Sequence, residues 1–225
     1  GKEVREYLKA DMEPMSSIII KNQGTIDKFI GDAIMAYWNA PLDVENHADM
    51  AVKASLDQLE ALNELNKKFE KDKLPTIDIG IGLNSGEVIV GEMGSSLRSD
   101  YTVIGDAINL GSRVESLCKY YGSKLNITNF TKEKKKKKYI FRFLDFVRVK
   151  GKTQPVEIWQ VIGSGEAKDE LKNELENYHK AIDFYKESKF LDALELFRKL
   201  DNLENKTNKN IYKIYIKKIH QNSVF

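Results

Sequence analysis

One carboxylate in this sequence occupies a position suited to metal chemistry. Asp32 follows Gly31 between two apolar stretches, residues 25–30 and 33–38, and this pattern predicts two strands joined by a tight turn. A carboxylate at such a turn projects from rigid backbone into open space, and Mg²⁺ prefers oxygen ligands of this kind. Asp32 is therefore a candidate metal ligand. The alternative is that Gly-Asp is simply a favourable turn sequence.

A lysine lies four positions before this aspartate. Alternation along a strand places Ile26, Lys28 and Ile30 on one face, so a cation interrupts an apolar stripe. Such a lysine can simply face solvent. It can also donate a hydrogen bond to a purine ring nitrogen or carbonyl, which makes Lys28 a candidate base-binding residue.

Two further polar residues fall on a helix expected over residues 106–121, which Gly122 ends. Asn109 and Arg113 are four residues apart, so they share a face beside the apolar stripe, one turn above each other. An amide can hold a ribose oxygen, and a guanidinium can bind phosphate. Asn and Arg on an exposed helix face are usually solvated residues without a special role. A role for Asn109 and Arg113 in binding nucleotide therefore depends on the other sequence motifs.

The elements that position these residues alternate between helices and strands. Apolar residues at helical spacing predict helices over residues 3–22, with Pro14 as a kink or boundary, and over residues 47–71. Residues 77–83 and 88–93 predict a second hairpin. Further strands are expected at residues 101–104, 125–128, 140–149 and 156–162. Because several pairs are hairpins, the pattern favours an α+β, ferredoxin-like fold, with a mostly antiparallel central sheet and packed helices.

The chain is expected to divide near Gly163. Gly163-Ser-Gly predicts a linker, so residues 1–163 would form one domain and residues 164–225 a short α-helical C-terminal extension. The extension has small and aromatic residues at the spacing of a tetratricopeptide repeat: Ala181, Phe184, Phe190, Ala193 and Phe197. A single repeat cannot bury its own face, so the unit must pack on the domain or on a partner. A helical hairpin that caps the domain is the alternative.

The composition narrows the class of protein. Hydrophobic residues make up 41% and charged residues 31% of the chain, as in soluble globular proteins, and a net charge of +2 argues for neither nucleic acid nor a membrane surface. Cys118, the single cysteine, excludes an internal disulfide framework and fits a reducing compartment. No apolar run reaches the roughly 18 residues of a membrane span. We expect a cytoplasmic domain that does not bind nucleic acid.

Four blocks of sequence follow one another in a characteristic order. They are Thr25-Ile-Asp-Lys-Phe-Ile-Gly-Asp-Ala-Ile-Met-Ala, Gly80-Ile-Gly-Leu-Asn-Ser-Gly-Glu, Asp100-Tyr-Thr-Val-Ile-Gly-Asp-Ala-Ile-Asn-Leu-Gly-Ser-Arg and Arg148-Val-Lys-Gly-Lys. Together they resemble the catalytic domain of the class III adenylyl/guanylyl cyclase family, over about residues 1–162.

The resemblance implies roles for five residues. Asp32 matches the second of two aspartates that bind two Mg²⁺ or Mn²⁺ ions. Lys28 matches the position that reads adenine and is typically glutamate in guanylyl cyclases. Thr102 occupies the companion purine-reading position, which is threonine in a bacterial subgroup of adenylyl cyclases. Asn109 and Arg113 match the family's transition-state asparagine and arginine.

Phosphate-binding residues follow less directly from the resemblance. Lys150 resembles the lysine that contacts the terminal phosphates, with Lys152 as the alternative. Arg98 lies near the family's other phosphate-binding arginine, with Leu97 where that arginine often stands. The family's first strand and its first metal aspartate come upstream of the helix that opens this chain, and no matching block precedes that helix here.

The resemblance implies conversion of ATP to 3′,5′-cyclic AMP and pyrophosphate. In this family the metal aspartates come from one subunit and the purine-reading and transition-state residues from the other, so a homodimer is expected. A sensor or membrane domain upstream in the parent protein would control the dimer. Two alternatives remain, a guanylate cyclase and a catalytically inactive regulatory or binding module.

Overall fold

The computed structural model describes residues 2–95 and 98–222, with side chains for residues 12–91 and 103–222. The described helices are α1 (Lys2–Lys21), α2 (His47–Lys71), α3 (Asp106–Ser116), α4 (Cys118–Tyr121), α5 (Asn129–Lys134), α6 (Asp169–Lys186), α7 (Phe190–Asp201) and α8 (Ile211–Asn222). The described strands are β1 (Thr25–Ile30), β2 (Ala33–Tyr37), β3 (Ile81–Leu83), β4 (Ile89–Ser95), β5 (Arg98–Ile104), β6 (Leu125–Thr128), β7 (Tyr139–Val147) and β8 (Val156–Ser164).

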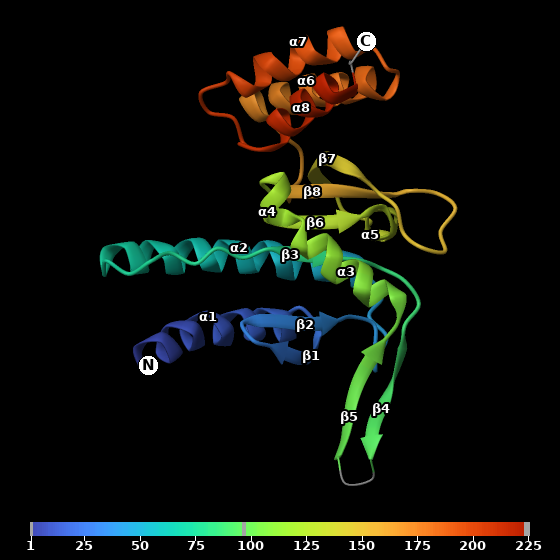
Figure 1. Ribbon diagram of the computed structural model, residues 1–225. Helices are drawn as coiled ribbons and strands as arrows, with labels where there is room; N and C mark the ends of the chain where they lie inside the picture. The colour runs from blue at the N-terminus through green and yellow to red at the C-terminus, as the bar shows by residue number, and fades with distance from the viewer. Residues whose placement is uncertain (1, 96–97, 223–225) are drawn as a thin grey trace.

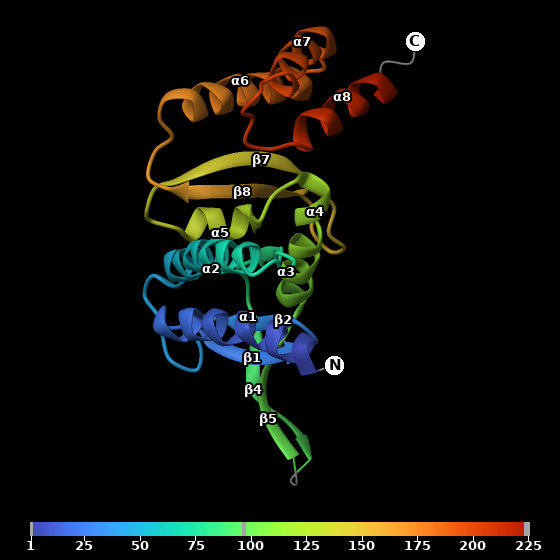
Figure 2. The ribbon, with the colours of Figure 1, turned by 90° about the vertical axis from the view of Figure 1, so that its left-hand side faces the viewer.

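The elements stack in layers along one axis (Figures 1 and 2). Helices α6, α7 and α8 lie at one end, above β7 and β8. Helices α2 and α3 lie on the other side of these strands, followed by α1 and the hairpin β1–β2. The hairpin β4–β5 projects from the body as an arm at the opposite end. The expected α+β architecture of strands with packed helices is confirmed.

The described strands form three sheets rather than one. The largest has the order β3-β6-β8-β7, with β3 parallel to β6 and the other neighbours antiparallel, whereas β1–β2 and β4–β5 are separate antiparallel pairs. The core of the large sheet includes Leu125 and Ile127 of β6, which pack with Val52 of α2. Alternating apolar residues therefore hold α2 against the sheet.

The expected hairpin between residues 77–83 and 88–93 is wrong. β3 pairs with β6, while β4 pairs with β5 over seven residue pairs, from Ile89 opposite Ile104 to Ser95 opposite Arg98. A hairpin pattern indicates pairing only between strands that are neighbours in the sequence. The parallel partner of β3 lies about forty residues later in the chain, so this pattern could not indicate it. Pro14 also lies inside the continuous helix α1 rather than at a boundary.

Close contact with β3 fixes the position of α3. A Cβ added to Gly82 would lie 2.4 Å from the backbone N of Glu115 and 2.6 Å from the carbonyl oxygen of Gly111. Only glycine lets the strand approach the helix backbone this closely. Leu110 and Val114 face the core, so the opposite side of α3 faces outward.

The C-terminal helices cover the outer edge of β7, the last strand of the described sheet. The Tyr178 hydroxyl donates to the carbonyl of Phe143, the Tyr215 hydroxyl donates to the carbonyl of Leu144, and the Phe143 N–H donates to Nε2 of His179. Covering an edge strand in this way blocks pairing with other strands. The extension therefore packs on the domain, although its likeness to a tetratricopeptide repeat stays a prediction.

The connection to these helices is short, because β8 continues through the first two residues of the expected linker. Ala181, Ala193 and Phe197 of the extension are buried, and they belong to the same apolar cluster as Phe143 and Val156 of the sheet. In the part of the chain that the structure describes, no helix is long and apolar enough to cross a membrane.

Candidate functional site

Asp32 lies at the exposed turn of the hairpin β1–β2. Ile30 pairs with Ala33, so Gly31 and Asp32 form a two-residue turn, and Gly31 has the positive φ of 60° that such turns require. Asp32 is exposed. The turn predicted from the sequence is confirmed, and the carboxylate is free to meet a ligand from solvent.

A bulge changes the expected alternation next to Lys28. The register shifts between Ile26 and Lys28, which leaves Asp27 as an extra residue on β1, so Ile26 no longer shares the face of Lys28. The Lys28 side chain is about half exposed, and its Nζ lies 3.6 Å from a carboxylate oxygen of the buried Asp27. The lysine is thus exposed and held beside an acid rather than set in an apolar stripe.

Asn109 and Arg113 lie on the exposed face of α3, one turn apart, as the sequence predicts. The Arg113 guanidinium donates from Nη1 to the carbonyl oxygen of Arg148, at 2.9 Å. Arg148 directly follows β7 and lies two residues before Lys150. This hydrogen bond ties the face of α3 to the loop between β7 and β8, so the fold brings Arg113 to the lysine loop.

The two candidate lysines of that loop differ in their surroundings. Both are exposed, and Gly151 between them takes a positive φ of 85°. The Lys152 ammonium lies over the ring of Phe130, 4.5 Å from its centroid. A cation–π contact of this kind holds Lys152 against the domain. Lys150 has no ion pair or ring contact among the described residues, which favours it as the lysine that meets phosphate.

The remaining candidates lie on the β4–β5 arm. Thr102 pairs with Gly91, and Arg98 pairs with Ser95 beside the end of the arm. Their side chains are not described. Leu97, the alternative position for the arginine, lies outside the described residues. The backbone places Thr102 near the base of the arm and Arg98 near its tip.

A second acid, which the sequence patterns did not single out, lies near Asp32. Burial, followed by the neighbouring charge of Asp32, raises the pKa of Glu115. One oxygen of Glu115 also lies close to β3, 3.0 Å from the position of a Cβ built on Gly80. The helical stripe that buries Leu110 and Val114 could have suggested that Glu115 faces this strand, but not that the hairpin turn lies nearby.

Asp32 by itself fits the role of a ligand for a hard divalent cation. The described residues include no cluster of three or more histidine, cysteine or acidic side chains that could hold a metal by themselves. Mg²⁺ commonly takes only one or two carboxylates from the protein and completes its shell with water and substrate phosphates. Asp32, exposed at a turn, is a suitable ligand of that type.

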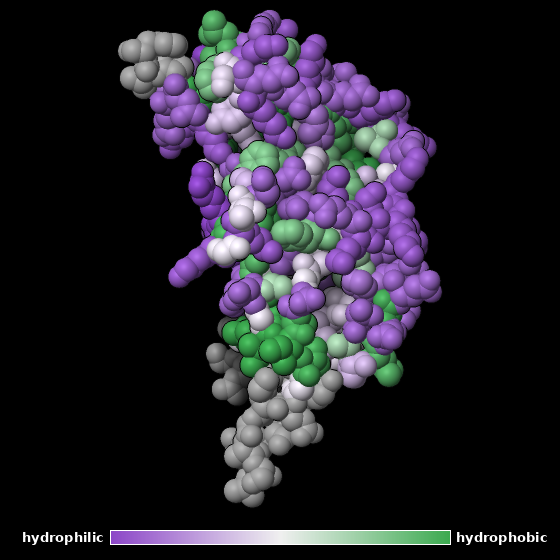
Figure 3. Space-filling model, turned by 90° about the vertical axis from the view of Figure 1, so that its right-hand side faces the viewer, coloured by the Kyte–Doolittle hydropathy of each residue, from purple (hydrophilic) through white to green (hydrophobic). Residues whose placement is uncertain are grey.

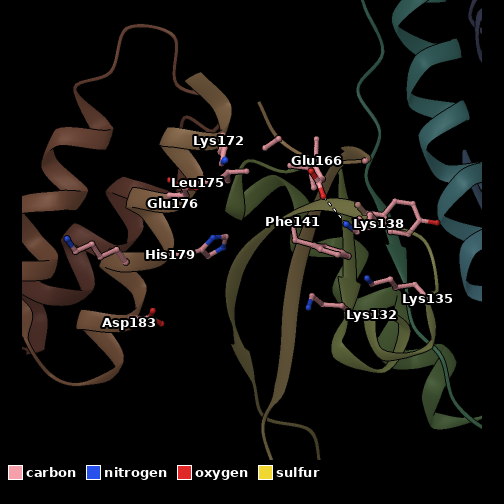
Figure 4. Close-up of a pocket in the computed structure, with 15 residues that line it drawn as sticks. Lys132, Lys135, Lys138, Phe141, Glu166, Lys172, Leu175, Glu176, His179 and Asp183 are labelled. Atoms are coloured by element: carbon pink, nitrogen blue, oxygen red, sulfur yellow. Dashed lines mark hydrogen bonds and ion pairs between the residues drawn. The ribbon is translucent and has the colours of Figure 1, made fainter. Parts of the chain in front are cut away.

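The groove between α6 and the start of β7 is a separate feature (Figure 4). It has a volume of about 740 Å³, and its lining includes Lys132, Lys135 and Lys138 on one side and Lys172 and His179 on the other. None of the site residues expected from the sequence lines this groove. The site residues expected from the sequence whose side chains are described therefore lie on the exposed face of α3, the lysine loop and the hairpin β1–β2, and not in this groove.

Fold and site together define a nucleotide cyclase catalytic domain. Residues 1–163 match the family model described as "Adenylate and Guanylate cyclase catalytic domain", so the chain belongs to this family. The solved guanylyl cyclase Cya2 is similar, with a TM-score of 0.66 and 34% identity over 75% of this chain and 84% of the other. The adenylyl cyclase CyaB from P. aeruginosa has a TM-score of 0.65 and 29% identity over 75% and 87%.

Relatives named adenylate cyclase are also similar in sequence. The "Adenylate cyclase, terminal-differentiation specific" of Dictyostelium discoideum is 38% identical over 80% of this chain and 9% of its own length. "Adenylate cyclase" of Anabaena cylindrica is 36% identical over 71% and 32%, and "Adenylate cyclase 1" of Rhizobium meliloti is 31% identical over 72% and 24%. The chain thus spans no more than about a third of the length of these relatives.

Proposed function

We propose that this chain is the catalytic part of an adenylate cyclase, a lyase that forms 3′,5′-cyclic AMP and pyrophosphate from ATP. The observation that carries the proposal is the Arg113–Arg148 hydrogen bond, which brings the exposed face of α3 to the loop of Lys150. A nucleotide across this junction would meet an amide, a guanidinium and an ammonium. Family membership supports the same reaction class.

The proposed reaction is an intramolecular phosphoryl transfer. The ribose 3′-oxygen bonds to the α-phosphorus and loses its proton to water, while the bond from that phosphorus to the β-phosphate oxygen breaks and pyrophosphate leaves. Two Mg²⁺ or Mn²⁺ ions held by Asp32 and the substrate would neutralise phosphate charge and acidify the 3′-hydroxyl. Asn109 orients the ribose, and Arg113 stabilises charge at the α-phosphate.

We assign the phosphate tail of ATP to Lys150 and Arg98. Lys150 is exposed and without an ion pair among the described residues, so its ammonium can meet the terminal phosphates from solvent. Arg98 would approach them from the arm. Arginine and lysine both bind phosphate, with the arginine fork giving the more directional contact.

We propose ATP rather than GTP as the substrate. Lys28 and Thr102 supply a cation and a hydroxyl, which suit the ring nitrogens and amino group of adenine, whereas a glutamate would suit guanine. The three relatives described above are named adenylate cyclases, although the similar structure of Cya2 is a guanylyl cyclase. Guanylate cyclase remains the second candidate, and the nucleotide assay below separates the two.

A homodimer completes the proposed site. Ile89 and Ile104 are cross-strand partners at the base of the β4–β5 arm, with 68% and 50% of their surface exposed. Figure 3 shows a green apolar patch just above the grey atoms at this end of the molecule. A two-stranded hairpin is at best marginally stable alone in water. A second copy that covers the patch would stabilise the arm and bring Lys28 and Thr102 of one protomer to Asp32 of the other.

Turnover measurements test the proposal. We expect cyclic AMP from ATP with Mn²⁺, little cyclic GMP from GTP, and about a hundredfold loss of kcat in Arg113→Ala, with Arg198→Ala on the exposed face of α7 as the matched control. The assay uses this chain and one extended upstream, because the family resemblance implies a first metal aspartate in an upstream segment. A dimeric extended chain that makes no cyclic nucleotide would support the inactive-module alternative instead.

The cellular setting is also a proposal. Since this chain spans a small part of its relatives, we propose a longer parent protein in which an upstream sensor or membrane domain controls the dimer. Cys118 is a buried free thiol, as suits a reducing cytoplasm. One similar solved structure is titled a bacterial light-regulated adenylyl cyclase, and this chain covers 48% of it.

A further inference from the structure

The C-terminal helices share one apolar core with the helix that carries Asn109 and Arg113. Leu110 and Val114 of α3 belong to the same buried cluster as Tyr178 of α6, Phe197 of α7 and Tyr215 of α8. Close-packed interiors transmit small displacements, because side chains cannot shift without moving their neighbours. The packing of these helices therefore bears on the position of α3.

The carboxylate of Asp145 connects strand β7 with helices α4 and α8. Asp145 of β7 accepts a hydrogen bond at Oδ2 from the Tyr121 hydroxyl of α4, at 3.0 Å, and the Lys218 ammonium of α8 lies 2.5 Å from the same oxygen. Burial, followed by the nearby Asp145 charge, raises the pKa of Tyr121, so its hydroxyl stays protonated and donates at neutral pH. The charged lysine holds the acceptor in place for this bond.

The loop before α8 binds α4 as well. Nδ2 of Asn208 donates to the carbonyl of Tyr121 at 2.8 Å, and Nδ2 of Asn210 donates to the carbonyl of Lys119 at 3.2 Å. Both carbonyls belong to the last turn of α4, where the Gly122 N–H also donates to the Lys119 carbonyl, so the asparagines add side-chain donors to this helix end. A Cβ added to Gly122 would lie 2.7 Å from the Asn208 side-chain oxygen, so the contact is close.

Two segments connected to Arg113, helix α4 and the end of strand β7, are thus bonded to the C-terminal helices or to the loop before α8. α4 follows α3 after Leu117, and β7 continues from Asp145 to Val147, directly before Arg148, whose carbonyl accepts the Arg113 hydrogen bond. We propose that α6, α7 and α8 position the catalytic face of α3, and that Asp145 is the positioning residue through which α8 acts. The inference rests on the proposed cyclase function of that face.

The distribution of contacts along β7 supports this role. At the start of the strand, the C-terminal helices stand away from the sheet across the lysine-lined groove of Figure 4. From Arg142 to Asp145, the Arg142–Glu174 ion pair, the hydrogen bonds accepted by the Phe143 and Leu144 carbonyls, and the Lys218–Asp145 ion pair attach the strand to these helices. The part of β7 that leads to the lysine loop is therefore held directly by the C-terminal helices.

Two variants test the positioning role on the chain that proves active. Lys218→Met removes the partner supplied by α8, and Asp145→Asn weakens the acceptor for Tyr121. We expect each to lower kcat about tenfold with little change in KM for ATP, because misplaced catalytic groups act on the transition state. Amide exchange in residues 106–121 should also rise in both. Lys213→Met, which removes an exposed ion pair of the same helix, is the matched control.

The outcomes separate this inference from the proposed function. Wild-type kcat and wild-type exchange in Lys218→Met would overturn the positioning role, whatever the activity of the protein. Faster exchange in residues 106–121 of both variants would support the coupling even if no chain makes a cyclic nucleotide, in which case only the proposed function fails. Because Lys218 is partly exposed, its variant is expected to fold, and it decides the question if Asp145→Asn does not.

Discussion

Arg142 of β7 and Glu174 of α6 form an ion pair inside the protein, at 3.1 Å, with exposed fractions of 0% and 5%. The guanidinium also donates to Gln160 of β8, Thr207 and Tyr212, and the carboxylate accepts from the last two as well. A buried pair is tolerated only when its remaining polar atoms are hydrogen-bonded, as most are here. The network ties the sheet to the C-terminal helices.

Removing one partner of this pair should destabilise the whole chain. We expect Glu174→Gln to lower the free energy of unfolding by about 3 kcal/mol, because the Arg142 charge stays buried without its counter-ion. Urea unfolding followed by circular dichroism measures the change. Glu195→Gln, which breaks the exposed pair with Lys199, is the control and should change stability by less than about 0.5 kcal/mol. Equal effects of the two substitutions would show that the buried pair is not critical.

His179 should make stability depend on pH. Burial, followed by the charge of Arg142, lowers the pKa of His179 from 6.5 to about 4, and its Nε2 accepts the Phe143 N–H. Between about pH 6.5 and pH 4, His179 is therefore protonated in the unfolded chain and neutral in the folded chain. The contribution of this residue to stability is full above pH 6.5 and falls as the pH drops toward 4, by on the order of 3 kcal/mol.

A comparison of variants isolates that contribution. The stability lost between pH 7 and pH 4 should be smaller in His179→Gln than in the wild type, because the glutamine does not titrate. His220→Gln, on the exposed surface of α8, should leave the pH dependence as it is. The assignment fails if the wild type and His179→Gln lose the same stability over this range.

The sequence predicts the elements better than their pairing. The Asp32 turn, the long helix α2 and the exposed pair on α3 follow from local spacing alone, because 3.6-residue and two-residue periods act within each element. The β3–β6 pairing depends on contacts between distant segments. No local pattern carries that information, which explains the wrong hairpin.

The site shows the same limit. Periodicity assigns Asn109 and Arg113 to one face, but the bond from Arg113 to Arg148 depends on how β7 packs beside α3. The bulge at Asp27 likewise interrupts strand β1, and the sequence pattern does not indicate the bulge. The charge of Asp32 acts on the pKa of Glu115 from a distant part of the sequence, which no local pattern indicates.

Lys28 should control the choice of base. Replacing it by glutamate exchanges a donor for an acceptor, so adenine would lose a hydrogen bond and guanine would gain one through its ring N–H and amino group. We expect Lys28→Glu to lower kcat/KM for ATP by about a hundredfold and to raise the ratio of GTP to ATP turnover. Lys199→Glu in α7 is a charge-matched control. An unchanged nucleotide ratio would remove Lys28 from the base site.

Gly82 should be essential for the close packing of α3 against β3. A Cβ at this position would lie 2.4 Å and 2.6 Å from backbone atoms of the helix, and backbone cannot move aside as the end of a side chain can. We expect Gly82→Ala to lower the free energy of unfolding by about 2–3 kcal/mol and to reduce kcat as well, because α3 is pushed outward. Gly163→Ala on β8 is the matched control, since the nearest atom would lie 3.8 Å from its added Cβ, an ordinary contact. If Gly82→Ala matches Gly163→Ala in both stability and kcat, close packing against β3 does not set the position of Arg113.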